Sequence, residues 1–157
     1  IADCAGGFFK GYKVVAGKHA KIVNACNELR NRGMAIVFLC HTVDIKHKNR
    51  PDLPDYTVYG LDMYKDSRPY YINHSDAVLY LKKVEVTKGY EENKKGQIIK
   101  HAKVKTTGER VLITSGDGIF GYVDAKNTFN MPDEIEVNHM ENPIVQYIPF
   151  FNKEETK

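Results

Sequence analysis

The sequence predicts an α/β fold, and two adjoining stretches carry that prediction. Residues 34–40 (MAIVFLC) form an unbroken apolar run, which is typical of a strand buried on both faces, and His41 follows at once. Apolar residues at helical spacing precede the run over 15–32, and Gly33 suits the left-handed position that ends a helix. In open α/β sheets, ligands bind beyond the carboxyl ends of the strands. His41 and the loop after it are therefore the first candidate site.

The middle of the chain predicts a long connection and a broken helix. Residues 42–55 (TVDIKHKNRPDLPD) are polar and contain two prolines, so we expect a surface loop, and loops of this length are usually functional or mobile. Residues 56–71 are rich in tyrosine and are interrupted by Gly60 and Pro69, which indicates an interrupted helix.

The second half predicts a meander of short strands. The stretches with strand character are 76–86, 97–106 (alternating, and therefore half-buried), 110–114 and 119–126. Turns are expected at 87–96, at Thr107-Gly108 and at 115–118. We assign residues 1–137 to the domain and 138–157 to a tail. The apolar patch of the tail, 144–151, is expected to dock on this domain or on a neighbouring subunit.

Length and composition indicate about one domain without a membrane segment. The chain has 157 residues and a formal net charge of +3, which is too mild to indicate a nucleic-acid or membrane partner by itself. No apolar run approaches the roughly 20 residues that span a bilayer, and we expect no signal peptide. Because the chain begins at Ile1 in what reads as mid-element sequence, we interpret it as a fragment or a processed product. Of the scattered cysteines Cys4, Cys26 and Cys40, two lie on predicted apolar faces, which indicates reduced, buried thiols.

Several catalytic motifs are excluded by spacing. Residues 11–18 (GYKVVAGK) resemble a phosphate-binding loop, but the glycines are one residue too far apart and His19 replaces the Ser or Thr that binds the metal. A helix N-terminus with an exposed lysine is the better interpretation. The histidines and cysteines lack metal-ligand spacing, and no G-x-S-x-G segment occurs.

Three groups of residues remain as candidates, each with a structural alternative. His41 could contact a ligand or simply end a strand. The cluster Lys46, Lys48 and Arg50 could hold phosphates, although a solvated loop explains it as well. A set of tyrosines could stack on bases or pack in the core: Tyr56, Tyr59, Tyr64, Tyr70 and Tyr71.

In their order, three segments resemble the C-terminal half of a RecA-like ATPase core, and most specifically the phage-encoded single-strand annealing ATPases of DNA recombination. The first segment is the helix, its turn at Gly33 and the strand that ends in His41 (RGMAIVFLCHT). The second is NHSDAVLYL, and the third is GERVLIT followed by DAKNTFNMPDEI. The resemblance covers roughly residues 12 to 136. It implies a partial P-loop ATPase core, with a helix–buried strand unit followed by a β-meander, that lacks the N-terminal Walker A segment.

The resemblance also implies roles for particular residues. His41 corresponds to the polar residue that senses the γ-phosphate and passes its state to the loop 42–55, which contacts DNA. Lys126 corresponds to a lysine that reaches across a subunit interface to the phosphates of a neighbour's nucleotide. Cations at that position stabilise the charge that develops during phosphoryl transfer. Thr128 departs from RecA, where a second lysine is usual.

The implied cofactors are ATP and Mg²⁺, bound by the full-length parent. The phosphate loop and the Walker B aspartate of that parent would precede Ile1. We therefore expect the isolated chain to bind neither ATP nor Mg²⁺ and to be inactive as an ATPase. The implied partners are single-stranded DNA and further copies of the chain in a ring or filament, in the cytoplasm of a bacterial host, with no membrane partner. Two alternatives stay open. One is a non-enzymatic nucleic-acid-binding module, and the other is a phage structural or assembly protein that docks through its tail.

Overall fold

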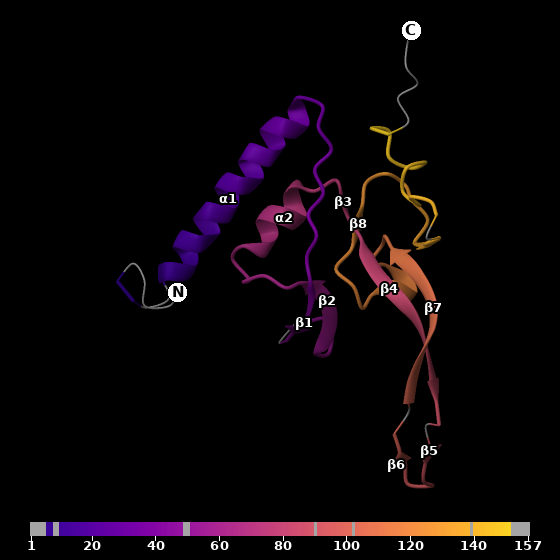
Figure 1. The fold of residues 1–157 in the computed structure, drawn as a ribbon. Coiled ribbons are helices and arrows are strands. Elements are labelled where there is room, and N and C mark those ends of the chain that lie inside the picture. Colours follow the sequence, from indigo (N-terminus) through magenta and orange to yellow (C-terminus); the bar gives the residue numbers. More distant parts are fainter. Residues whose placement is uncertain are drawn as a thin grey trace.

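The computed structural model describes residues 6–7, 10–48, 51–89, 91–101, 103–138 and 140–151. It is a mixed α/β structure in which one long helix stands beside small antiparallel sheets (Figure 1). The predicted α/β class is confirmed at this level. No helix in the described part of the chain has the length and apolar character needed to cross a bilayer.

The long helix α1 (Lys10–Asn31) confirms the predicted helix and extends it toward the N-terminus. The near-miss phosphate loop at residues 11–18 lies within its first turns. At the other end, Gly33 has a φ of +90°, its N–H bonds to the carbonyl of Arg30, and the N–H of Met34 bonds to the carbonyl of Leu29. This pair of bonds is a Schellman motif, which satisfies carbonyls at the helix end.

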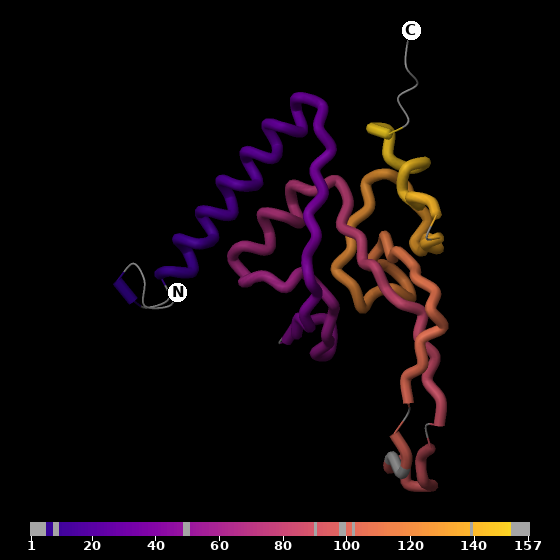
Figure 2. Tube along the Cα trace, in the orientation of Figure 1, coloured from indigo at the N-terminus to yellow at the C-terminus, as the bar shows by residue number. Residues whose placement is uncertain are grey.

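Residues 34–41 differ from the prediction of a strand buried on both faces. They run from α1 to the first hairpin as an extended segment (Figure 2) that belongs to no helix or strand. Val37 is 73% exposed and Leu39 is 94% exposed. Phe38 packs edge-on against Tyr71, with ring centroids 5.1 Å apart. The prediction of two-sided burial is wrong for the described chain, because a buried strand needs neighbouring strands and none lies beside this segment.

The predicted loop 42–55 and the first half of the predicted broken helix form a hairpin instead. β1 (Thr42–His47) pairs antiparallel with β2 (Tyr56–Leu61), from Thr42 opposite Leu61 to His47 opposite Tyr56. The alternation of Val43 and Ile45 with polar residues has the period of a strand, and the prolines fall in the connection. Of the helix predicted over 56–71, only the C-terminal end is helical, in α2 (Arg68–His74).

The second half is built on a long antiparallel ribbon. β4 (Tyr80–Lys88) pairs with β7 (Lys103–Ile113), and β7 also pairs with β9 (Glu134–Glu136). The ribbon continues into β5 (Glu91–Glu92) and β6 (Ile98–Lys100), and Figure 1 shows it projecting from the rest of the molecule. We call residues 80–113 the arm.

Three details of the predicted meander are wrong. Gly108, with a φ of +94°, does not form a turn between strands, since β7 runs through it with an irregular register opposite β4. The predicted strand 119–126 is replaced by a short 3-10 helix, η1 (Gly118–Phe120), and by β8 (Lys126–Asn127), which pairs with β3 (Ala77–Val78). Within the predicted half-buried strand 97–106, residues 103–106 are exposed, because no other described element covers either face of the distal arm.

The buried core is small. Among the described residues, one group of buried apolar side chains lies at the foot of the arm and includes Val58, Val111, Ile113, Val123, Met131 and Ile135; a second group, Ala16, Val23 and Tyr71, belongs to α1 and α2. The chain exposes 12193 Å², whereas a compact monomer of this mass exposes about 8,000 Å². In the tail, Met140, Phe150 and Phe151 are exposed. The chain therefore has an open surface with much apolar area.

Candidate nucleic-acid interface

His41 lies where the extended segment enters the first hairpin. Its side chain is exposed, and its backbone carbonyl accepts a hydrogen bond of 2.9 Å from the N–H of Asp62, just past β2. This bond holds the ends of the hairpin together at His41. A change in the position of His41 would therefore be transmitted to β1 and β2.

The predicted basic cluster lies at the far end of that hairpin. Lys46 is exposed on β1 and Lys48 is exposed just after it, while Arg50 lies outside the described residues. Next to them, the imidazole of His47 stacks on the ring of Tyr56, with centroids 4.8 Å apart and planes 12° from parallel. The hairpin therefore presents two lysines and a stacked ring pair.

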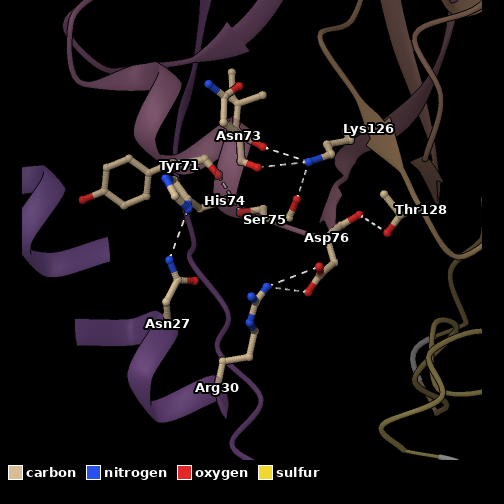
Figure 3. A network of polar contacts seen from close by, with 10 residues as sticks. Asn27, Arg30, Tyr71, Asn73, His74, Ser75, Asp76, Lys126 and Thr128 are labelled. Carbon is tan, nitrogen blue, oxygen red and sulfur yellow. Dashed lines mark hydrogen bonds and ion pairs between the residues drawn. The ribbon is translucent and has the colours of Figure 1, made fainter. Parts of the chain in front are cut away.

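Lys126 lies in a different place, at the end of α2 (Figure 3). Its ammonium donates to the carbonyls of Ser75 at 2.7 Å, Asn73 at 3.3 Å and Ile72 at 3.4 Å. These carbonyls belong to the last turn and cap of a helix, where the backbone carries unsatisfied acceptors and partial negative charge. In this conformation Lys126 caps α2.

Further polar contacts join the same region to α1 and β8. Arg30 forms an ion pair with Asp76 at 3.3 Å, and Thr128 donates to the backbone carbonyl of Asp76 at 2.6 Å (Figure 3). Asn27 contacts the ring of His74 at 3.2 Å. In the described part of the chain, no hydrogen bond or ion pair connects Lys126 with His41. The structure therefore does not bring these two predicted site residues into contact.

The arm is a basic element that the sequence analysis did not single out. Residues 80–113 contain eight lysines and one arginine against four glutamates, a net charge of +5, although the whole chain has a net charge of +3. The remainder of the chain is thus slightly acidic. A positive stripe of this kind is the electrostatic footprint of a surface that binds polyanions.

Like charges lie directly opposite each other along the arm. Lys83 pairs with Arg110 in the register of β4 and β7, and Lys88 pairs with Lys103. Such cross-strand pairs destabilise a sheet, because the two cations are held close together. The described arm contains an ion pair between Lys100 and Glu91 at 2.8 Å, but none joins those four residues to a carboxylate. The uncompensated charge favours binding of an anionic partner.

At the foot of the arm, three tyrosines from separate elements surround a cavity of about 300 Å³. The rings of Tyr59 and Tyr80 are parallel within 6°, with centroids 5.6 Å apart, and Tyr122 lies edge-on to Tyr59 at 6.3 Å. The cavity is also lined by Lys82 and Lys83. It combines aromatic faces with cations, which is the composition of surfaces that bind unpaired bases.

The environment of this cavity raises two pKa values. A hydrogen bond of 3.2 Å to the hydroxyl of Tyr122 raises the pKa of Lys82, against the opposing effect of partial burial, and the ammonium lies 5.1 Å from the centroid of the Tyr122 ring. Burial is the first cause that raises the pKa of Tyr80, followed by repulsion from Tyr59. Both shifts favour the protonated forms. The cavity therefore keeps a cation and a neutral phenol at neutral pH.

The predicted tyrosine set divides between core and surface. Tyr71 is buried and its hydroxyl contacts the ring of His19 at 2.8 Å, while Tyr64 stacks on Tyr12 with centroids 4.2 Å apart. Tyr59 stays 42% exposed at the cavity. Tyr80 and Tyr122, which the sequence analysis missed, complete the site. The lysines that recur over 80–105 are the sequence signal that could have identified this region.

A second cavity, of about 480 Å³, is polar and acidic. Its lining includes Asp117, Asp124 and Asp133. Within the described ranges, no group of three or more His, Cys, Asp or Glu side chains is arranged to hold a metal ion. Of the predicted thiols, Cys26 is partly exposed, Cys40 is exposed and Cys4 lies outside the described residues, so the expected burial of Cys40 is wrong.

Comparison with known proteins identifies no relative: no protein-family model, curated protein or solved structure matches the chain.

Proposed function

We propose that this chain is the C-terminal part of a phage-type RecA-like ATPase that acts in DNA recombination and single-strand annealing. The parent protein would bind ATP and Mg²⁺ between subunits of a ring or filament and would bind single-stranded DNA. The observation that carries the proposal is the form of residues 34–41, which adds to the three sequence segments that resemble that family.

Residues 34–41 have the features of a sheet strand without its neighbours. In the described chain, no backbone hydrogen bond involves residues 35–40. One side of the segment packs on a helical layer, where Phe38 meets Tyr71, while Val37 and Leu39 point to solvent. An apolar strand of this kind is stable when other strands pair with its edges and cover its open face. In the proposed parent, those strands come from the part of the ATPase core outside these 157 residues.

The open surface supports the same proposal. The accessible area of 12193 Å² exceeds the compact expectation by about 4,000 Å². Permanent interfaces bury about 2,000–5,000 Å² in total, which is about 1,000–2,500 Å² on each partner, so the excess on this one chain is larger than a single such interface covers. An ATPase core that is completed by further sequence and by neighbouring subunits would cover such a surface.

On this proposal, His41 senses the γ-phosphate and moves the β1–β2 hairpin, which carries Lys46 and Lys48 toward DNA. The bond between the His41 carbonyl and Asp62 provides a direct mechanical connection for that movement. Lys126 acts in trans only after its ammonium leaves the three carbonyls of α2, so its capping contacts would compete with a neighbour's phosphate.

The test uses the full-length gene product and measures ATP binding and ATP hydrolysis with and without single-stranded DNA. We expect His41→Ala to keep ATP affinity and to lose most of the DNA stimulation, because the donor at the γ-phosphate is removed. His41→Gln retains a hydrogen-bond donor and should keep part of the stimulation. If the gene product has no phosphate loop, or if His41→Ala is stimulated normally, the assignment is wrong.

A second function is favoured by the charge of the arm: a nucleic-acid-binding module without enzymatic activity. The net charge of +5 lies on an element that the ATPase resemblance does not need for nucleotide binding. Salt-titrated binding of the chain to oligonucleotides, together with the ATPase assay on the full-length product, separates the two. Binding without any ATP turnover would favour the module.

A further inference from the structure

We propose that the foot of the arm is a binding site for an unpaired nucleic-acid strand, in which a base stacks on the tyrosines of the 300 Å³ cavity and the adjoining phosphates follow the lysines of the arm. This site deepens the nucleic-acid-binding part of the proposed function. It uses residues other than the β1–β2 hairpin, so it can be tested separately.

The cavity offers a preformed stacking surface. The rings of Tyr59 and Tyr80 are parallel within 6°, and the ring of Tyr122 packs edge-on against that of Tyr59. Backbone bonds hold this arrangement, since the N–H of Tyr59 donates to the carbonyl of Tyr122 at 2.7 Å and the N–H of Asp124 donates to the carbonyl of Tyr59 at 2.9 Å. A base that stacks on the exposed ring of Tyr59 would therefore find it already ordered.

Lys82 supplies a fixed cation beside the stacked base. The hydroxyl and ring of Tyr122 position its ammonium, so little side-chain entropy remains to be lost when a phosphate binds. Lys83, which also lines the cavity, is exposed and lies opposite Arg110. The phosphates on either side of the base would thus meet two lysines.

The arm continues this positive surface away from the cavity. Lys103 and Lys105 are two residues apart on β7 and share a face with Lys88, which is opposite Lys103. From Lys82 to Lys88 the strand advances about 20 Å. A flexible single strand can follow such a track, and its phosphates would relieve the repulsion between Lys88 and Lys103. A base within a duplex is already stacked and paired, so we expect duplexes to bind less well.

The experiment measures the fluorescence anisotropy of labelled oligonucleotides, as single-stranded DNA, single-stranded RNA and a DNA duplex of equal length, over a range of salt concentrations. Tyr59→Ala should raise the Kd for single strands about tenfold, within the range found for loss of one stacked base. Tyr59→Phe keeps the ring and should bind as the unmodified chain does. Circular dichroism of both variants shows whether the fold is retained.

The phosphate track has its own variant and control. Lys88→Ala combined with Lys103→Ala should reduce the slope of log K against log salt by about 1.4, because two phosphate contacts are lost. These side chains are exposed, so the fold should be unaffected. The matched control, Lys18→Ala with Lys21→Ala, removes two exposed lysines from α1 and should leave the slope unchanged.

The outcomes separate this site from the proposed ATPase. Unchanged single-strand affinity in Tyr59→Ala, or duplex affinity equal to that of single strands, overturns the stacking site. An unchanged salt slope in the lysine pair overturns the phosphate track. Tight binding of either DNA or RNA single strands supports the site, and the difference between them identifies the sugar that it accepts. Loss of affinity only in Lys46→Ala with Lys48→Ala would assign binding to the hairpin instead.

Discussion

At the scale of single residues, the contacts of Lys126 in the structure differ from the role that the sequence predicts for it. By sequence it is a cation in a segment that resembles a trans-acting phosphate contact, but its ammonium is bonded to three backbone carbonyls at the end of α2. A helix end leaves carbonyls without partners, and a nearby lysine satisfies them. The same side chain can serve a neighbour's nucleotide only by giving up these bonds.

Removing the Lys126 ammonium should therefore weaken the fold of the chain itself. We expect Lys126→Ala to lower the free energy of unfolding by about 1–2 kcal/mol, because the carbonyls of Ile72, Asn73 and Ser75 lose a charged donor. Lys65→Ala, in the exposed turn before α2, should change it by less than about 0.5 kcal/mol. Urea denaturation followed by circular dichroism measures both. Equal stabilities would show that Lys126 does not cap α2.

At the scale of elements, some features are determined by residues close together in the sequence and others by more distant ones. The end of α1 is determined locally, since Gly33 adopts a φ of +90° and closes the Schellman motif with Arg30. The β1–β2 hairpin is also local, although the charges and prolines of 42–55 led to the prediction of a loop. The arm is less local, because its two strands are joined by a connection that contains the small β5–β6 ribbon.

Two glycines in or after α1 should respond in opposite ways to the same substitution. Gly33→Ala should destabilise the chain by about 1 kcal/mol, because an L-residue is strained at a positive φ. Gly17→Ala should stabilise it by about 0.5–1 kcal/mol, because Gly17 is inside the helix and a methyl group there meets no atom within 4 Å. Thermal or urea unfolding compares the pair. Destabilisation by both variants would contradict the assigned helix end.

At the scale of the whole molecule, the excess surface is the dominant feature. Small buried clusters, one at the foot of the arm and one on α1 and α2, hold together a long helix, a projecting ribbon and an open apolar segment. Unpaired strand edges and large apolar patches promote association. The chain by itself should therefore self-associate through residues 34–41.

This association can be tested with one substitution and a matched control. Leu39→Lys should shift the chain toward monomer in sedimentation velocity, because it places a charge in the centre of the open strand, where Leu39 is 94% exposed. Ile119→Lys replaces an apolar residue that is 84% exposed elsewhere and should have no such effect. If both variants sediment like the unmodified chain, residues 34–41 are not the associating surface.

The sequence by itself determined the features that depend on near neighbours. These are the helix ending at Gly33, the extended character of 34–41, the strands within 76–86 and 110–114, and the exposure of Lys46 and Lys48. Periodicity and turn chemistry act over a few residues, so they can be read directly. The hairpin of 42–61 was also local, but its alternation was too weak to be recognised against its prolines and charges.

Only the tertiary structure decided which distant residues meet. The cavity of Tyr59, Tyr80 and Tyr122 joins segments more than 60 residues apart, and Lys126 reaches carbonyls more than 50 residues away. The tertiary structure also determined which apolar residues are buried. The apolar pattern of 34–40 predicts a buried strand, but burial needs partner strands, and the described chain brings none beside it. The apolar pattern of a segment indicates that it can be buried in a sheet, but the tertiary structure determines whether neighbouring strands are present to bury it.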